Sequence, residues 1–203
     1  SLISICYSNL NNFEQAEKYI SKAIETKPME VGFYINKGNI LIKMTKYSEA
    51  EAVYNDAIKL NLESADLYYN LGVLYSMQKK HAQAIHHYNK SLNINEFNKH
   101  ALNNLGNSSK ELGNYKNAIN FFNKAISLDN NFSEAKYNLS LVMLLTNPNH
   151  TAWEQYEYRN INNDKEKNLI KSNIKKWDGS NLKNKSIVIF SEQGIGDNIQ
   201  FAR

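Results

Sequence analysis

The sequence predicts an all-α protein made of stacked helical hairpins, and two observations support this prediction. The 203 residues include 32 asparagines but only 8 glycines and 2 prolines, a composition that favours long regular elements over glycine turns. Small residues recur every 34 residues, and within each interval the apolar residues follow helical spacing in two blocks separated by a polar turn. Each interval therefore predicts one helix-turn-helix unit.

Four positions of the interval keep the same kind of residue along the chain. The first of these columns contains only small residues, and the other three contain alanine, large apolar side chains, and alanine or serine. The columns are Ser4, Gly38, Gly72, Gly106 and Ser140; Ala16, Ala50, Ala84 and Ala118; Ile20, Tyr54, Tyr88 and Phe122; and Ala23, Ala57, Ser91 and Ala125. This agreement in phase predicts that successive units share one geometry.

The motif Tyr68-x2-Leu71-Gly72-x2-Tyr75, followed by Ala84-x3-Tyr88, resembles the tetratricopeptide repeat. The resemblance covers about residues 1–147 and implies a right-handed solenoid in which each hairpin is stabilised by its neighbours. We expect the small residue at position 72 to let the two helices approach where Ala84 passes, with Tyr88 filling the space beyond. The expected repeats are 1–30, 31–64, 65–98, 99–132 and a degenerate 133–160, which together form a domain 1–160.

A different pattern follows the repeats. Residues 161–184 are expected to form a charged connector, and residues 185–203 the truncated start of a Rossmann-like domain with a strand from Ile187 to Phe190, a glycine-bearing loop and a helix. Residues 150–203 resemble the junction in bacterial proteins that join tetratricopeptide repeats to a heptosyltransferase-like glycosyltransferase. The resemblance implies that Asp197 is the general base for the acceptor hydroxyl, and the alternative is that Asp197 caps the following helix.

The chain begins at Ser1 and stops at Arg203 within an apparently helical stretch, so we expect it to be a fragment. The second lobe that such a transferase needs is not in the sequence. We therefore expect no sugar transfer from this chain, whatever the activity of its parent. Because the isolated strand has unpaired backbone groups that can pair with another chain, we expect residues 180–203 to be either disordered or ordered only by self-association through the C-terminal tail.

One asparagine column predicts a binding surface. It lies two residues before each small-residue position and consists of Asn36, Asn70, Asn104 and Asn138. In tetratricopeptide superhelices this position faces the concave groove, so the resemblance implies a row of amides that can bind the backbone of an extended peptide or protein segment. The alternative is that asparagine is merely common at this position of the family and abundant in this chain.

Other positions of the expected groove carry mixed side chains and no strong charge. The candidate peptide-binding residues among them are Asn39, Tyr69, Asn103 and Asn107. The first-choice function is thus a peptide-binding scaffold, and the alternative is the targeting or assembly part of a glycosyltransferase.

Several other classes of function are disfavoured. The spacing of His81, His86 and His87 does not place two ligands from His81 on one helical face, so we expect no metal site and no cofactor. The single cysteine, Cys6, falls in a column with Ile40, Leu74 and Val142 and is expected to be a buried core residue. No apolar run is long enough to cross a bilayer, and the net charge of +4 is spread along the chain, which gives no support to nucleic-acid binding. We expect a cytoplasmic location.

Overall fold

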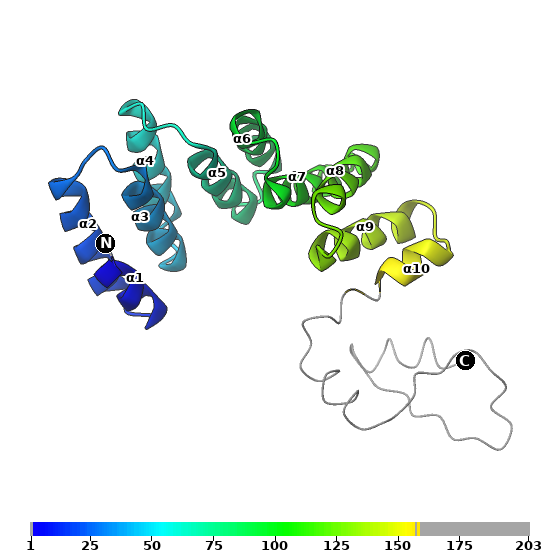
Figure 1. Cartoon of the computed structure of the whole chain (residues 1–203), viewed down its shortest axis with the longest axis horizontal. Helices are drawn as coiled ribbons and strands as arrows, with labels where there is room; N and C mark the ends of the chain where they lie inside the picture. Colours follow the sequence, from blue (N-terminus) through cyan, green and yellow to red (C-terminus); the bar gives the residue numbers. More distant parts are fainter. Residues whose placement is uncertain (1, 157, 159–203) are drawn as a thin grey trace, which may run out of the picture. The chain divides into compact units, whose positions relative to one another are not determined.

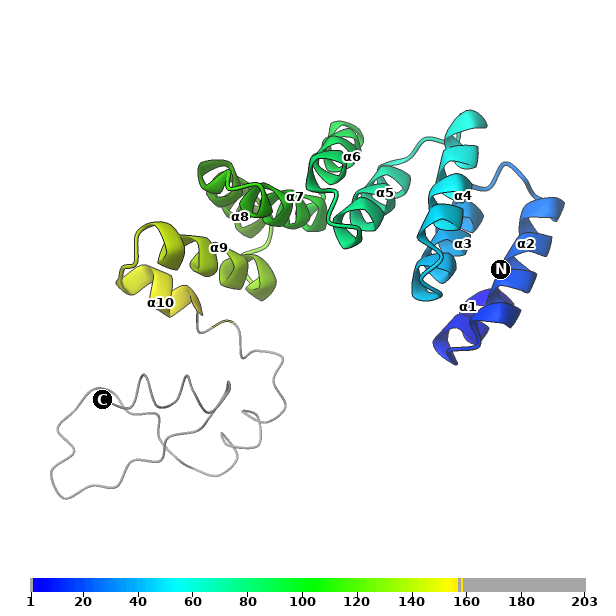
Figure 2. The ribbon, with the colours of Figure 1, turned by 180° about the vertical axis from the view of Figure 1, so that it is seen from behind.

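The computed structural model describes residues 2–156 and 158, and these residues form ten α-helices in consecutive helix-turn-helix pairs (Figure 1). The helices are α1 (Leu2–Asn9), α2 (Phe13–Thr26), α3 (Val31–Lys43), α4 (Tyr47–Lys59), α5 (Ala65–Met77), α6 (His81–Ile94), α7 (Lys99–Glu111), α8 (Tyr115–Leu128), α9 (Ser133–Thr146) and α10 (His150–Tyr156). Figure 2 shows the pairs from behind, and in both views the two helices of each pair lie side by side. The predicted all-α repeat fold is confirmed. The predicted strand at residues 187–190 lies outside the described residues.

Each central pair is closed by a glycine on the first helix and an aromatic ring on the second. A Cβ atom on Gly38, Gly72 or Gly106 would lie within 3.0 Å of a ring carbon of the aromatic residue 16 positions later. These rings belong to Tyr54, Tyr88 and Phe122, and each ring residue is at most 1% exposed. The requirement for a small residue is thus confirmed, and the ring is what occupies the space that a side chain would need.

In the first pair, different residues fill the space between the two helices. Ser4 takes the glycine position and Ile20 takes the aromatic position, and both residues are fully buried. The Ser4 hydroxyl donates a hydrogen bond of 2.8 Å to the backbone carbonyl of Ala16 on α2, so the added polar group has a partner. A larger residue on α1 is therefore matched by a smaller one on α2.

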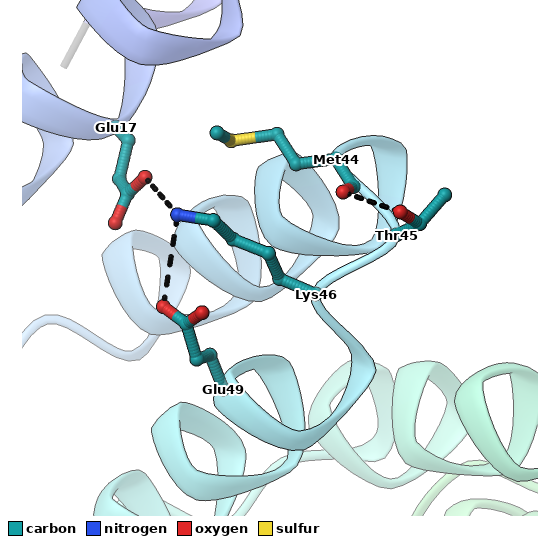
Figure 3. A network of polar contacts seen from close by, with 5 residues as sticks. All are labelled: Glu17, Met44, Thr45, Lys46 and Glu49. Atoms are coloured by element: carbon teal, nitrogen blue, oxygen red, sulfur yellow. Dashed lines mark hydrogen bonds and ion pairs between the residues drawn. The ribbon is translucent and has the colours of Figure 1, made fainter.

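Neighbouring pairs stack through contacts between the second helix of one repeat and the first helix of the next. An ion pair also joins the first two repeats, from α2 to the start of α4 (Figure 3). The Lys46 amine, at the start of α4, lies 3.5 Å from a carboxylate oxygen of Glu17 on α2 and 3.8 Å from one of Glu49 on α4. The Lys46 and Glu17 side chains are partly exposed, so solvent screening leaves their attraction a minor contribution.

The turns inside the repeats contain a further column at the same 34-residue interval, which sequence analysis missed. Asn11, Thr45, Lys79 and Gly113 all have positive φ values, between 58° and 76°. Only the last of these is a glycine, the residue that adopts this conformation without steric cost. At Thr45, where φ is 60°, the β-branched side chain is strained, and its hydroxyl donates a hydrogen bond to the Met44 carbonyl beside it (Figure 3).

The prediction that Cys6 is buried is wrong, because the Cys6 side chain is exposed. Ile40 and Val142, in the same column, are buried because they pack against the second helix of the preceding repeat, α2 and α8 respectively. No helix precedes α1 in the described residues. The corresponding side of α1 is therefore open, and the hydrophobic Leu2 and Ile3 are exposed there as well.

The glycine–ring contact predicts strong coupling between positions 72 and 88. We expect Gly72→Ser alone to destabilise the protein by about 1–3 kcal/mol through overpacking, and Tyr88→Ile alone to destabilise it by a similar amount through the cavity left behind. Together they recreate the Ser4 and Ile20 pair of the first repeat, so we expect the double variant to regain at least about 1 kcal/mol relative to the sum. Urea unfolding followed by circular dichroism measures this, and additive effects would contradict the contact.

The strained turns predict a stabilising substitution. Thr45→Gly relieves the positive φ strain, and we expect the free energy of unfolding to rise by about 0.5–1 kcal/mol in spite of the extra freedom of the unfolded chain. The reciprocal change Gly113→Thr is the matched control, and we expect it to destabilise. Thermal melts of both variants test the assignment, which fails if Thr45→Gly lowers the melting temperature.

Candidate binding surface

The four asparagines of the predicted ladder lie on α3, α5, α7 and α9, the first helices of consecutive repeats. We call the surface around Asn36, Asn70, Asn104 and Asn138 the ladder face. All four side chains are partly exposed. Neighbouring helices in this series contact each other directly, α3 with α5, α5 with α7, and α7 with α9. The structure therefore places the four amides at one position on adjacent helices.

Hydrogen bonds between neighbouring repeats join residues 35 positions apart on this face. The Nδ2 atom of Asn104 donates to the Tyr69 hydroxyl at 3.3 Å, and the Nδ2 atom of Asn138 donates to Oδ1 of Asn103 at 3.0 Å. In the repeat before, the corresponding acceptor position is Ile35, which has no polar side-chain atom. Asn70 instead donates to the backbone carbonyl of Asp66 on its own helix, at 2.7 Å.

Asn103 differs from the rest of the predicted binding residues because it is 1% exposed. Its Nδ2 atom donates a 2.8 Å hydrogen bond to Oε1 of Glu134 on α9. A carboxylate only accepts hydrogen bonds, so this contact fixes which end of the Asn103 amide points to α9. The Asn103 oxygen must then face Asn138, whose amide nitrogen becomes the donor.

Tyr69 lies at the centre of the ladder face, next to the ring of Tyr88, with 6.0 Å between the ring centroids. Burial raises the pKa of Tyr69, the hydrogen bond from Asn104 lowers it, and the charge of Glu134 raises it again. The pKa of Tyr88 is also raised, first by burial and then by Tyr69, while hydrogen bonding from Ser76 and Asn104 opposes this. The Asn104 amide thus opposes the rise in both pKa values, and its hydrogen bond is made to the Tyr69 hydroxyl.

The remaining predicted peptide-binding residues differ in their hydrogen bonds. Oδ1 of Asn39 accepts a 2.8 Å hydrogen bond from the hydroxyl of Tyr54, the ring that covers Gly38. Asn36 and Asn107 are partly exposed, and neither has a side-chain hydrogen bond to any described residue. Asn39 therefore supports the packing of its repeat, while Asn36 and Asn107 keep their polar groups available.

Sequence analysis missed Glu134, which joins two repeats of the ladder face. It belongs to the column Gly32, Asp66, His100 and Glu134, which lies four residues before the ladder on the same helices. Residues four apart share a helix face, and that spacing is the signal that could have identified the column. Its residue types differ from repeat to repeat, which explains why a search for recurring residues did not find it.

The histidines lie elsewhere. His87 on α6 stacks against Tyr75 and Tyr68 of α5, with ring centroids 5.1 Å and 6.1 Å away, and the exposed His86 meets it edge-on. Within residues 2–156 and 158, no three His, Cys, Asp or Glu side chains come together as metal ligands would. Asp197, the predicted catalytic residue, lies outside the described residues.

Comparison with protein families identifies the repeats. Models of the tetratricopeptide repeat match residues 2–28, 65–98 and 100–132, and a further TPR repeat model matches residues 38–79. Together these segments cover more than half of the chain. The chain belongs to the tetratricopeptide repeat family. Tetratricopeptide repeats are scaffolds that bind proteins and peptides, which gives this chain its general class of function.

Solved structures of tetratricopeptide repeat proteins share the fold. The chain is 21% identical to MamA, with a TM-score of 0.68 over 83% of this chain and 97% of that one. It is 22% identical to YrrB, described as a TPR protein with an unusual peptide-binding site, with a TM-score of 0.63 over 84% and 89% of the two chains. For PilF of Pseudomonas aeruginosa the identity is 18% and the TM-score 0.71, over 77% and 72%. None of the curated proteins compared with the chain matches it.

None of the helices in the described part of this tetratricopeptide repeat protein is long and apolar enough to cross a membrane.

The partly buried position of His87 predicts a pH-dependent stability. Burial, followed by the charges of His86 and Lys90, lowers the pKa of His87 from 6.5 to about 4, with Glu51 opposing the shift. Between pH 6.5 and about 4, His87 binds a proton in the unfolded chain but stays neutral in the folded chain. The free energy of unfolding therefore decreases as the pH falls toward 4. We expect this loss to be about 1–2 kcal/mol after allowance for solvent screening of the partly exposed ring.

His87→Phe keeps a stacked ring and removes the titration, so we expect it to flatten this part of the pH dependence. Denaturant midpoints measured between pH 4 and 6.5 test this, with the exposed His150→Gln as the matched control. A slope in His87→Phe equal to that of the native protein would contradict the assignment.

Proposed function

We propose that the ladder face binds an extended peptide segment of a partner protein. The observation that supports this most directly is the row of partly exposed amides at one position of four successive repeats, with polar atoms that form no hydrogen bond to the described residues. Asn36 has no side-chain hydrogen bond within the described residues, and the Oδ1 atoms of Asn70, Asn104 and Asn138 accept none there. Such groups can bind peptide backbone without regard to its side chains.

The spacing of the repeats suits an extended chain. Packed helices lie about 8–10 Å apart, and an extended peptide advances about 3.3 Å per residue. Successive ladder amides therefore match backbone groups about three residues apart. The description of YrrB as a TPR protein with a peptide-binding site supports the same use of this fold, at 22% identity.

The alternative to peptide binding is that the repeats hold an acceptor or an assembly for a glycosyltransferase. It depends on residues 150–203 and on Asp197, and most of this segment lies outside the described residues. The matched family segments end at residue 132, so the comparisons give this alternative no support. It stays a prediction, as does self-association through the tail, and the peptide-binding proposal depends on neither.

The ladder predicts a loss of peptide affinity when its central amides are removed. A binding peptide would first be selected from a displayed library of random linear peptides. We expect Asn70→Ala combined with Asn104→Ala to weaken binding of that peptide about 10-fold, since each lost hydrogen bond contributes about 0.5–1.5 kcal/mol. Calorimetric titration measures the change, and circular dichroism confirms that helical content is kept.

The matched control is Asn89→Ala combined with Asn123→Ala. These two exposed asparagines lie on α6 and α8, also 34 residues apart, but on the second helices of their repeats. We expect this variant to bind the peptide as the native protein does. Equal affinity of the ladder variant and the control would exclude the ladder from binding.

A further inference from the structure

The ladder face has more hydrogen-bond acceptors than donors available to a ligand. The Nδ2 atoms of Asn70, Asn104 and Asn138 all donate within the protein, to the Asp66 carbonyl, the Tyr69 hydroxyl and Asn103 respectively. The Oδ1 atoms of these three asparagines accept no hydrogen bond from any described residue. Each of these nitrogens keeps one further N–H, whereas each oxygen keeps both of its lone pairs, so a ligand that supplies donors finds more partners at this face than one that supplies acceptors.

Glu134 fixes this polarity at the end of the face formed by α7 and α9. Its Oε1 atom accepts from the buried Asn103, and Asn103 in turn accepts from Asn138. Because a carboxylate cannot donate, neither amide can be reversed without losing a hydrogen bond. The hydrogen bond thus turns the Asn138 oxygen away from Asn103 and leaves it free to accept, on the same helix face as Glu134 four residues earlier.

The charge of Glu134 has no counter-ion in the described part of the chain. Glu134 is exposed, and no Lys, Arg or His nitrogen among the described residues lies within 4.0 Å of its carboxylate. Its second oxygen, Oε2, has no hydrogen bond there. The negative charge reaches Tyr69 on α5, where it contributes to the raised pKa of that phenol.

We propose that Glu134, with the oxygens of Asn104 and Asn138, binds a Lys or Arg side chain of the extended peptide. The inference rests on the proposed function, because it adds a charged subsite to the same face. Lysine and arginine side chains carry three and five N–H donors and no acceptor, which complements a surface that offers a carboxylate and amide oxygens.

An acidic ligand residue does not fit this subsite. A carboxylate from the ligand would face the like charge of Glu134 and the two amide oxygens, and its compensation would be limited to the second N–H of each amide and the Tyr69 hydroxyl. A neutral amide such as glutamine could donate to the same oxygens, but it lacks the charge-assisted part of the interaction, which makes such hydrogen bonds about twice as strong. The ranking we expect at this position is therefore basic, then neutral, then acidic.

The test compares the native protein with Glu134→Gln. Glutamine keeps an oxygen that accepts from Asn103, so the internal hydrogen bonds survive, while the charge is removed and a donor replaces the outward acceptor. Random linear peptides would be displayed and selected against both proteins, and the best peptide titrated with its basic residue intact and replaced by glutamine. Glu14→Gln is the matched control, since Glu14 is also an exposed glutamate in the first turn of a helix.

We expect the native protein and Glu14→Gln to select peptides with a Lys or Arg at one fixed position. Replacing that residue by glutamine should weaken binding about 10-fold in both, with a loss that shrinks at higher salt, and less than about 2-fold in Glu134→Gln. Equal losses in all three proteins, or no basic residue among the selected peptides, would overturn the subsite.

The outcomes separate the two proposals. Peptides whose binding depends on Asn70 and Asn104 but not on a basic residue would leave the proposed function intact and overturn the subsite alone. A selected peptide whose affinity depends on Glu134 but not on Asn70 and Asn104 would overturn the ladder and the part of the subsite assigned to the Asn104 oxygen. Absence of any selected peptide would overturn both.

Discussion

The contact between a glycine on the first helix of a repeat and an aromatic ring on the second fixes the geometry on which the rest of the structure depends. The ring lies where the glycine lacks a side chain, so the separation of the two helices is set by the thickness of a ring. Ser4 with Ile20 shows that volume is what must be conserved, because the first pair divides it differently between the helices. Repeats built in this way have the same shape, and repeats of one shape can stack.

Because the repeats have the same shape, residues that recur at a fixed interval in the sequence are also regularly spaced in the structure. Residues 34 apart occupy the same place on the equivalent helices of successive repeats. A hydrogen bond between neighbouring repeats then recurs between residues 35 apart. Asn104 with Tyr69 and Asn138 with Asn103 are two instances of this bond. Where Ile35 removes the acceptor, the Asn70 amide turns back to its own helix. The regular spacing of the ladder asparagines is thus a consequence of packing in the interior. The hydrogen bonds of each asparagine depend on the residue type in the column that begins with Ile35 and Tyr69.

The sequence was sufficient to predict the fold, because buried columns keep their residue types and their period is visible without a structure. It was not sufficient at α1, where Cys6 has the pattern of a buried residue but is exposed, since no helix precedes α1 among the described residues. It also missed the left-handed turn positions, since Thr45 and Lys79 occupy the place of Gly113 at the cost of strain. Asn103 was predicted to bind peptide, yet Glu134 from the next repeat reaches it and it is buried. Whether such a residue is exposed or buried depends on contacts between side chains of adjacent repeats. Comparing the residues of a single column does not reveal these contacts.

The column four residues before the ladder explains how one scaffold can present different chemistry. Its members, Gly32, Asp66, His100 and Glu134, differ in size and charge although the glycine and ring columns beside them hardly vary. A substitution in this column does not disturb the contact between glycine and ring, so the fold tolerates the variation. It does change the ladder face, because an acceptor such as Glu134 forces the amides next to it into one orientation. The packing columns therefore specify where the asparagines lie, and the variable column specifies which end of each amide, and which charge, a ligand meets.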